Sequence, residues 1–545
     1  MIIADLKNFF YDNRYLWPIL LLGLLARLYA FSHTYVINPD GVYYLYQAKA
    51  LLYNMPDKAG SCGFPFISLY PVLIMLFYKI FGDWIVAAKA VSLFFGVMTI
   101  VPFYFLMKRF FTITVASITT LIFSLNPVLV ERSVDLIKGP VFWFFSVLGL
   151  LLFVKALDRH KGRLFLFSSI TFFIAGLARI DAMFLFFGSL LYLILRSGRT
   201  AKSIIPFSIP LLVIFGAIGA SFFISENGLP IWNLYIEPRV TYLISNALFN
   251  PVYNVIATNL ETLHTQQLEQ FPVYFFKDVK HLLWLVALGL FLKSCMNAFY
   301  LPFYILFFSG FFSIKKALKK APLSGYFFFQ TVLASTFVYL FLVSTWFIER
   351  RYIAVVMFPA FFFIGLGVEK LIESLKSRRI KEGLIIPGLC ILTILITLPE
   401  NLESSGKDKL GIKEIGERIS LDVKGESVRI ATSEGRIITY ANLSSSELIC
   451  PIPVIEYSGL TQMPYSDLIA LLKEKDVEYF IWEESEWEKS SYDLLKEVKA
   501  GDMIVKGIWK IKEEEFVLFK VITEGINYSL ELTTNKHLSH IKGEI

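Results

Sequence analysis

A carboxylate just after the first apolar run is the side chain in this sequence best placed to do chemistry. The run covers about residues 15–36, Asn38-Pro39-Asp40 follows, and an amphipathic helix is expected to begin near Asp40. A carboxylate in this place can take a proton from a reacting group as a general base. It can equally cap the helix by accepting a hydrogen bond from a backbone N–H. Position alone leaves both interpretations open.

Several other charges also stand at the ends of apolar runs: Lys138, Arg179, Asp181, Glu349, Arg350 and Arg351. Arginine can hold a phosphate with two parallel hydrogen bonds, so these cations are candidates for binding an anion. Each also has a structural interpretation. Arg179 to Asp181 could be an interfacial turn, residues 349–351 could anchor lipid headgroups, and the charges in 131–135 could form exposed ion pairs.

The composition indicates that membrane-spanning helices position these residues. Hydrophobic residues make up 56% of the 545 positions and charged residues 18%. The apolar residues collect in runs of roughly 17–25, the length of a helix that crosses a bilayer. We predict about eleven spanning helices, near residues 15–36, 84–107, 113–130, 139–157, 164–178, 182–196, 203–225, 297–314, 326–346, 352–370 and 383–399. The short run 282–295 could lie at the interface, re-enter or add a span.

Loop charge predicts the orientation. The short loops near residues 108–109, 158–163, 196–202, 315–320 and 376–381 are all rich in Lys and Arg, which places them in the cytoplasm. The longer or mixed loops 38–83, 131–138, 226–296 and 347–351 are then external. We therefore expect a multi-pass protein of the cell (plasma) membrane, with a cytoplasmic N-terminus and an external C-terminal tail.

The tail, residues 400–545, has the pattern of a soluble domain. Short apolar runs such as 428–431 and 479–482 predict strands, and the charged stretch 465–475 predicts a helix between them. We expect a small external α/β domain following a transmembrane domain of residues 1–399. The net charge of +7 lies mainly in short loops rather than on one soluble face, which argues against a nucleic-acid partner. The four cysteines show no metal-binding spacing.

A series of short motifs follows the chain from about residue 15 to residue 370. The first external loop has Asp40, Tyr44, Ala48 and Leu51 in the pattern Asp-x-x-x-Tyr-x-x-x-Ala-x-x-Leu. Later motifs are Gly63, Tyr70-Pro71, Phe81-Gly82, Asn126-Pro127, Gly176-Leu177-Ala178-Arg179, and Arg351-Tyr352 with Pro359. In this order the chain resembles the GT-C superfamily of membrane glycosyltransferases. It is most similar to the protein mannosyltransferase and lipid A aminoarabinose transferase branch, glycosyltransferase family 39-like.

The resemblance implies a GT-C fold and an activity. Such an enzyme moves a sugar, a hexose or a pentose, from a polyprenyl-phosphate carrier to a protein, lipid or glycan acceptor. That transfer needs a base for the acceptor hydroxyl and positive charge for the leaving phosphate. Asp40 suits the first role, with Asp135 as a second catalytic candidate. The expected phosphate-binding residues are Lys138, Arg179, Arg350 and Arg351, and the expected cavity-lining residues are Tyr43, Tyr44, Tyr70, Asp181 and Tyr352.

The chain departs from this family pattern at two acidic positions. Many relatives carry Asp-Glu where this sequence has Asp40-Gly41, and a Glu near the position of Lys138. The departures argue against a mechanism with two carboxylates. They also weaken the case for a divalent cation, Mg²⁺ or Mn²⁺, for which Asp40 is the candidate ligand.

Two other functions would also suit a polytopic chain. A transporter or flippase for lipid-linked glycans is the main alternative, and a receptor whose tail binds a ligand is another. Transporters often contain inverted repeats and broken helices near the bilayer midplane. No internal repeat is visible in this sequence, and its polar residues gather at one face, which favours the enzyme.

Overall fold

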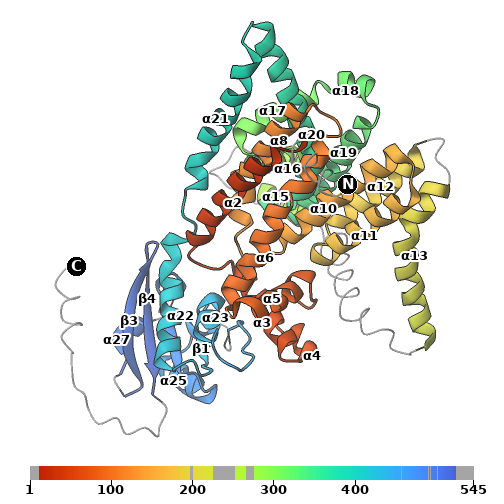
Figure 1. The fold of residues 1–545 in the computed structure, drawn as a ribbon. Coiled ribbons are helices and arrows are strands. Elements are labelled where there is room, and N and C mark those ends of the chain that lie inside the picture. The colour runs from red at the N-terminus through yellow and green to blue at the C-terminus, as the bar shows by residue number, and fades with distance from the viewer. Residues whose placement is uncertain are drawn as a thin grey trace. The chain divides into compact units, whose positions relative to one another are not determined.

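The long apolar runs form helices in the computed structural model, because a helix satisfies its backbone polar groups internally. The structure describes residues 12–196, 201–224, 252–265 and 275–522, except 454, 456, 489, 491 and 500. The chain divides into two compact units, Met1–Lys407 and Asp408–Ile545 (Figure 1).

The first unit is built from helices. In chain order they are α2 (Leu16–Ser32), α3 (Pro39–Leu52), α4 (Pro56–Ala59), α5 (Leu69–Phe81), α6 (Trp84–Met98), α7 (Ile100–Met107), α8 (Ile113–Leu125), α9 (Pro127–Arg132), α10 (Gly139–Arg159), α11 (Gly162–Ala178), α12 (Ala182–Leu195), α13 (Ala201–Ile224), α15 (Val252–Thr265), α16 (Phe275–Phe299), α17 (Leu301–Phe311), α18 (Ile314–Lys320), α19 (Ser324–Thr345), α20 (Arg350–Ser377) and α21 (Glu382–Asn401).

Six of the described helical segments are long and apolar enough to cross a membrane by length and composition: Trp84–Met107, Gly139–Arg159, Asp278–Phe299, Ser324–Thr345, Arg350–Ser377 and Gly383–Asn401. The pair α17 and α18, bent by 59°, makes a seventh if it counts as one span. The chain is thus a multi-pass membrane protein, and several shorter apolar helices accompany these segments. The exact number of spans stays a prediction.

The segment around residues 275–320 differs in detail from the predicted spans. The run 282–295, left open by the sequence, lies inside the continuous helix α16. The predicted span 297–314 is interrupted at Tyr300, whose φ is +66°, and α17 begins directly after it with a proline in its first turn. A proline is favourable in the first turn because it lacks the N–H that a helix start leaves unpaired.

Two helix breaks lie against one another inside the first unit. Asn126 separates α8 from α9, and its side chain caps α9 by accepting a hydrogen bond from the Leu129 N–H at 3.2 Å. The same amide donates to the Phe299 carbonyl at 3.0 Å, next to the break between α16 and α17. Fully buried Arg27 of α2 donates to the Ser124 carbonyl at 2.8 Å. These bonds satisfy carbonyls that a broken helix would leave unpaired, and they join α9 to the end of α16.

Helix α20 is the most enclosed of the candidate spans. In its most apolar window 89% of the residues are buried, against 17% in α21. Its backbone touches that of α17, because a Cβ added at Gly367 would lie 2.1 Å from the Leu306 carbonyl oxygen. Small residues commonly allow such close approaches between membrane helices. Close packing along α20 therefore fixes the position of Arg350 and Arg351 at its first turn.

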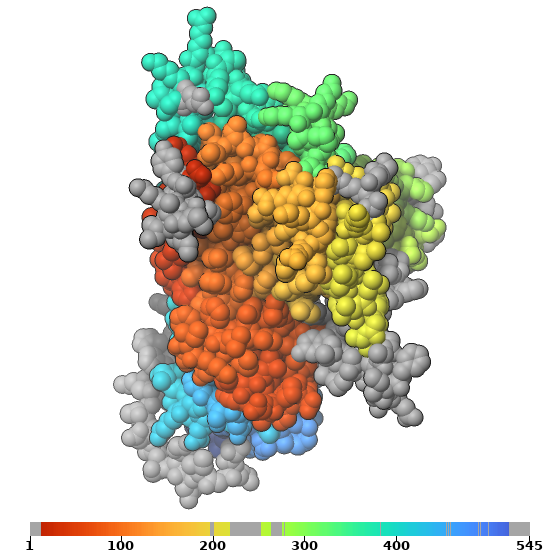
Figure 2. Space-filling model, turned by 45° about the vertical axis from the view of Figure 1, so that its right-hand side comes forward, coloured from red at the N-terminus to blue at the C-terminus, as the bar shows by residue number. Residues whose placement is uncertain are grey.

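Helices α10 to α13 form a neighbouring layer. In Figures 1 and 2 they lie side by side, in light orange to yellow, and α11 packs against α10, α12 and α13. Between α12 and α19, Ser189 and Tyr326 share a buried hydrogen bond of 2.7 Å, and Gln330 donates to both residues. This polar cluster ties the layer to α19, the neighbour of α20.

The second unit is a small mixed α/β domain, as the alternation of short strands and charged helices predicts. Its strands are β1 (Ile430–Ala431), β2 (Tyr479–Glu483), β3 (Met503–Ile511) and β4 (Glu514–Val521), in the order β1-β2-β4-β3. β1 and β2 are parallel, and the other pairs are antiparallel. The helices of this unit are α22 (Leu410–Asp422), α23 (Gly435–Ala441), α24 (Tyr457–Leu460), α25 (Tyr465–Glu474), α26 (Glu484–Trp487) and α27 (Leu494–Glu497), with the 3-10 helix η3 (Lys407–Lys409) at the boundary between the two units. Leu468 and Leu472 of α25 pack with Phe480 and Phe519 of the sheet to form its core.

A candidate active site

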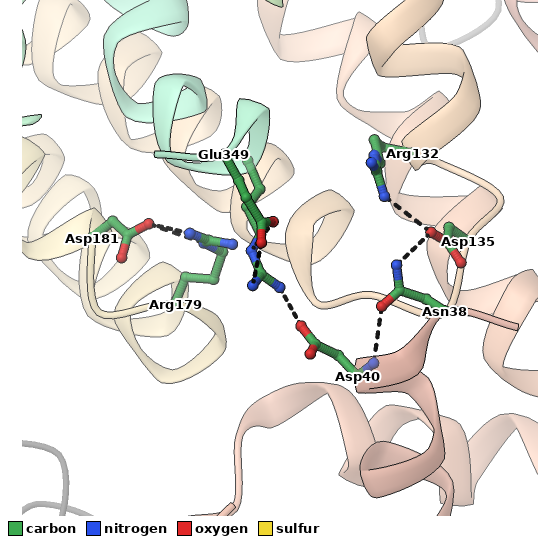
Figure 3. Close-up of polar contacts among 8 residues, drawn as sticks. Asn38, Asp40, Arg132, Asp135, Arg179, Asp181 and Glu349 are labelled. Carbon is green, nitrogen blue, oxygen red and sulfur yellow. Dashed lines mark hydrogen bonds and ion pairs between the residues drawn. The ribbon is translucent and has the colours of Figure 1, made fainter. Parts of the chain in front are cut away.

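Asp40 lies in the first turn of α3, and the capping role belongs to its neighbour. The Asn38 side chain accepts a hydrogen bond from the Asp40 N–H at 3.0 Å, and Pro39 begins the helix. The structural alternative for Asp40, a helix cap, is therefore wrong. Its carboxylate instead forms an ion pair with Arg351 at the start of α20, 311 positions away in the sequence (Figure 3). The Asp40 side chain keeps 25% of its surface exposed, so the carboxylate remains accessible.

Arg351 is held between two carboxylates. Besides Asp40, its Nε lies 2.8 Å from Oε2 of Glu349, and 29% of its side-chain surface is exposed. The Tyr352 ring lies next to two guanidinium groups, with its centroid 5.5 Å from Arg351 and 5.4 Å from Arg179. Two arginines from distant segments are thus gathered around one aromatic ring, next to the Asp40–Arg351 pair.

Arg179 and Asp181 pair with one another across the turn between α11 and α12. The Arg179 Nε donates to Asp181 Oδ2 at 3.0 Å, and only 6% of the Arg179 side chain is exposed. The guanidinium also lies 5.8 Å from the centre of the Phe142 ring. The pair compensates both charges, since an unpaired charge between apolar runs is costly.

Asp135 is enclosed by hydrogen-bond donors. Its Oδ2 accepts from Asn38 Nδ2 at 3.1 Å and pairs with Arg132 at 3.3 Å, while its Oδ1 accepts from the Leu136 N–H at 2.8 Å (Figure 3). Burial raises the pKa of this carboxyl above its usual value, and Arg132, the N–H of Leu136 and Asn38 oppose that shift. Because both oxygens are engaged, Asp135 is less suited than Asp40 to take a proton from a substrate.

Lys138 sits among aromatic rings. Its ammonium is 5.8 Å from the ring centres of Tyr44 and Phe64 and 5.4 Å from that of Phe66. The ring faces attract a cation electrostatically, so this arrangement fastens the loop before α10 to the first loop. Lys138 does not line the pocket described below.

The tyrosines of the first loop differ in their surroundings. Tyr70 is fully buried, and its hydroxyl donates to the Ala88 carbonyl at 3.0 Å, so it holds α5 against α6. Tyr44 is buried with its ring edge against Tyr70, whereas half-buried Tyr43 meets Phe64 at 5.2 Å between ring centres. None of the three rings is among the residues that line the pocket described below, and Tyr70, which was expected in a cavity, is fully enclosed and packs against Tyr44 of α3.

A pocket of ≈ 310 Å³ opens beside the Asp40–Arg351 pair. Its lining residues are Arg132, Ser294, Asn297, Ile348, Glu349, Arg350 and Arg351. Of the predicted phosphate-binding residues, Arg350 and Arg351 line it, and Lys138 and Arg179 do not. Arg132, Ser294 and Asn297 were missed as site residues. Arg132 resembled one half of an exposed ion pair. Ser294 lies in the run 282–295, which the sequence left open, and Asn297 stands at the start of a segment predicted as a spanning helix.

The residues around Asp40 do not fit a divalent cation. Among the described positions, no group of three or more His, Cys, Asp and Glu side chains could hold a metal. The Asp40 carboxylate already has a guanidinium as its partner. Mg²⁺ and Mn²⁺ prefer several oxygen ligands, and this site offers them a cation as neighbour instead.

Comparison with known proteins gives one family match by sequence. Residues 68–221 match the profile of the family described as dolichyl-phosphate-mannose-protein mannosyltransferase. By sequence alone, no curated protein matches the chain. The matched residues include α5 to α12 and the turn that carries Arg179.

Solved structures show the fold. An oligosaccharyltransferase of Archaeoglobus fulgidus, tethered to an acceptor peptide, has a TM-score of 0.54 at 11% identity, covering 87% of this chain and 70% of its own. The same archaeal enzyme with an inhibitory peptide and a dolichol-phosphate has a TM-score of 0.50 at 12% identity, covering 87% and 70%. ArnT from Cupriavidus metallidurans, bound to undecaprenyl phosphate, has a TM-score of 0.53 at 12% identity, covering 92% and 97%.

The ArnT similarity extends over nearly the full length of both chains, and the family match lies inside the helical unit. Both findings agree with the series of motifs that begins at Asp40. The chain is a multi-pass membrane protein with the GT-C fold, and its resemblance to the membrane glycosyltransferases of the protein mannosyltransferase and ArnT group is confirmed.

Proposed function

We propose that this protein is a glycosyltransferase that moves a sugar from a polyprenyl-phosphate carrier to an acceptor hydroxyl. The observation that carries the proposal is a part-exposed carboxylate, Asp40, paired with an arginine that also lines a pocket rich in guanidinium groups. Two of the similar structures contain a polyprenyl phosphate of this class, a dolichol-phosphate and undecaprenyl phosphate. The acceptor would be a protein, a lipid or a glycan.

The arrangement divides the chemistry between Asp40 and the arginines. Asp40 takes the proton of the acceptor hydroxyl while the acceptor oxygen bonds to the anomeric carbon of the sugar. The bond from that carbon to the phosphate oxygen breaks, and its electron pair leaves with the phosphate. The leaving phosphate gains a negative charge, which Arg350 and Arg351 would stabilise from the pocket.

Arg351 would act on two groups in this scheme. It pairs with the base, Asp40, and it lines the pocket in which the leaving phosphate would lie. It pairs with the Asp40 carboxylate before the reaction. When Asp40 becomes protonated that pairing weakens, and the negative charge appears on the phosphate instead. Arg351 can then balance the new charge without a large movement, which is the kind of prepared electrostatic environment that lowers a barrier.

The test of the function uses the purified protein and radiolabelled polyprenyl-phosphate sugars, hexoses and pentoses in turn. We expect the radiolabelled sugar of one of these donors to leave the lipid phase, because it is transferred either to an added acceptor or to water. The transporter alternative predicts the opposite result: intact lipid-linked sugar in detergent, and movement of that lipid between the leaflets of reconstituted vesicles.

We further propose that the basic loops face the cytoplasm and that the second unit lies outside the cell membrane. Cysteines introduced at two exposed positions test this orientation, Ser444→Cys in the second unit and Lys316→Cys in α18. An impermeant maleimide should label the first in intact cells and the second only after permeabilisation, with labelling of the unchanged chain subtracted. Labelling of Lys316→Cys in intact cells would overturn the orientation.

A further inference from the structure

Arg132 lines the pocket from a different helix than the other two arginines. It is the last residue of α9, whereas Arg350 and Arg351 form the first turn of α20. Its side chain is 32% exposed, and its NH1 lies 3.3 Å from Asp135 Oδ2. Within the described part of the chain this is its one recorded partner. A guanidinium has five N–H donors, so most of those on Arg132 remain available to a ligand.

Arg132 is oriented by a chain of contacts that begins at the start of α3, the helix that carries Asp40. Asn38 caps α3 by accepting from the Asp40 N–H, and it donates from Nδ2 to Asp135 at 3.1 Å. Asp135 in turn holds Arg132. Figure 3 shows this continuous line from Asp40 through Asn38 and Asp135 to Arg132. A long, flexible side chain is thereby given one preferred direction, which reduces the entropy lost when it binds.

Part of the pocket lining comes from α16. Ser294 and Asn297, three positions apart on α16, supply neutral polar groups to the lining. The end of α16 is joined to α9 through the Asn126 amide, which donates to the Phe299 carbonyl at 3.0 Å. The helices that carry Arg132 and Asn297 are therefore joined by a direct hydrogen bond between two helix breaks.

We infer that Arg132 is a second anchor for the phosphate of the lipid carrier, and that Asp135 is its positioning residue. The inference rests on the proposed function. The lining contains three guanidinium groups and one carboxylate, Glu349, so it favours an anion. A phosphate gripped from α9 and from α20 is held on two sides, which also fixes the direction of its bond to the sugar. Asp135 then acts through Arg132, and Asp40 remains the base.

The experiment measures binding of a sugar-free polyprenyl phosphate to the purified full-length protein in detergent, with the neutral polyprenol as a comparison ligand. Arg132→Ala should weaken phosphate binding by about tenfold to a hundredfold, the usual result of losing a hydrogen bond between charged groups. Polyprenol binding should not change. Arg132→Lys keeps the positive charge but loses the two parallel hydrogen bonds of a guanidinium. Its affinity for the phosphate should therefore lie between those of the parent and of Arg132→Ala.

Asp135→Asn tests the positioning role. It keeps the size of the side chain and removes the negative charge that orients Arg132. We expect weaker phosphate binding than in the parent, by a smaller factor than in Arg132→Ala, and no additional loss when both changes are combined. If Asp135 were itself the catalytic carboxylate, Asp135→Asn would instead abolish transfer at unchanged phosphate affinity.

Arg109→Ala is the matched control, because Arg109 is a part-exposed arginine paired with Asp158, and it does not line the pocket. It should bind the phosphate like the parent. Parent-like binding in Arg132→Ala would overturn the inference while leaving the proposed function in place. If the unchanged protein binds polyprenyl phosphate no better than polyprenol, the proposed function itself fails.

Discussion

Replacing Asp40 with Asn should lower the rate of sugar transfer by at least about a hundredfold while the protein still folds and binds its donor. The substitution keeps the shape of the side chain and removes its capacity to take a proton. Folding should survive because the helix cap is Asn38, which stays in place. Arg351 keeps Glu349 as a partner, at 2.8 Å, so the guanidinium is not left without a carboxylate. The loss should therefore appear in kcat and much less in donor affinity.

The measurement combines single-turnover transfer with donor binding on the same preparations. Asp57→Asn is the control, since Asp57 is an exposed carboxylate in the first turn of α4, in the same loop. It should transfer sugar at the parent rate, which separates a specific role of Asp40 from a general effect of charge at a helix start. Transfer at the parent rate by Asp40→Asn would remove Asp40 from the chemistry, and the search for the base would then turn to Asp135, Glu131 and Asp181.

Replacing Arg351 should affect binding as well as rate, and in a graded way. Arg351→Ala removes the guanidinium that lines the pocket and leaves Asp40 and Glu349 close together without their shared cation. We expect donor affinity to fall by about tenfold to a hundredfold, with a further loss in rate because Asp40 is no longer held in place. Arg351→Lys should lose less affinity, because it keeps the charge and gives up only the two-pronged contact.

Equilibrium binding of the polyprenyl-phosphate sugar measures this ranking. Arg378→Ala is the control, as it removes an exposed arginine at the other end of α20, away from the pocket lining. It should leave both affinity and rate unchanged. Parent-like donor affinity in both Arg351 variants would take this residue out of the phosphate site, and Arg351 would then serve only to orient Asp40.

The sequence alone was sufficient for features that depend on neighbouring residues. Apolar runs long enough to cross a bilayer became helices, because the length of a run and the need to satisfy the backbone are local properties. The alternation of short strands and charged helices in the tail likewise predicted the mixed α/β unit. Arg179 and Asp181, two positions apart, could be expected to pair because their closeness follows from the chain itself.

Tertiary structure decided which of these local features work together. The Asp40 carboxylate at the start of α3 pairs with Arg351 at the start of α20 rather than with a group of its own helix. Tyr70, expected in a cavity, is buried because α5 packs against α6, where the Tyr70 hydroxyl donates to the Ala88 carbonyl. Neither result can be read from spacing, since each depends on where the second helix or loop comes to lie.

The pocket is the clearest case of this limit. Arg132, Asn297 and Arg351 come from three separate helices, and the Asp40–Arg351 pair joins residues 311 positions apart. The residue types were visible in the sequence, but their grouping depends on how α9, α16 and α20 pack around the two helix breaks at Asn126 and Tyr300. Charges that look equivalent along the chain are therefore placed differently by packing: Lys138 lies among aromatic rings, Arg179 pairs with Asp181, and Arg350 and Arg351 line a pocket.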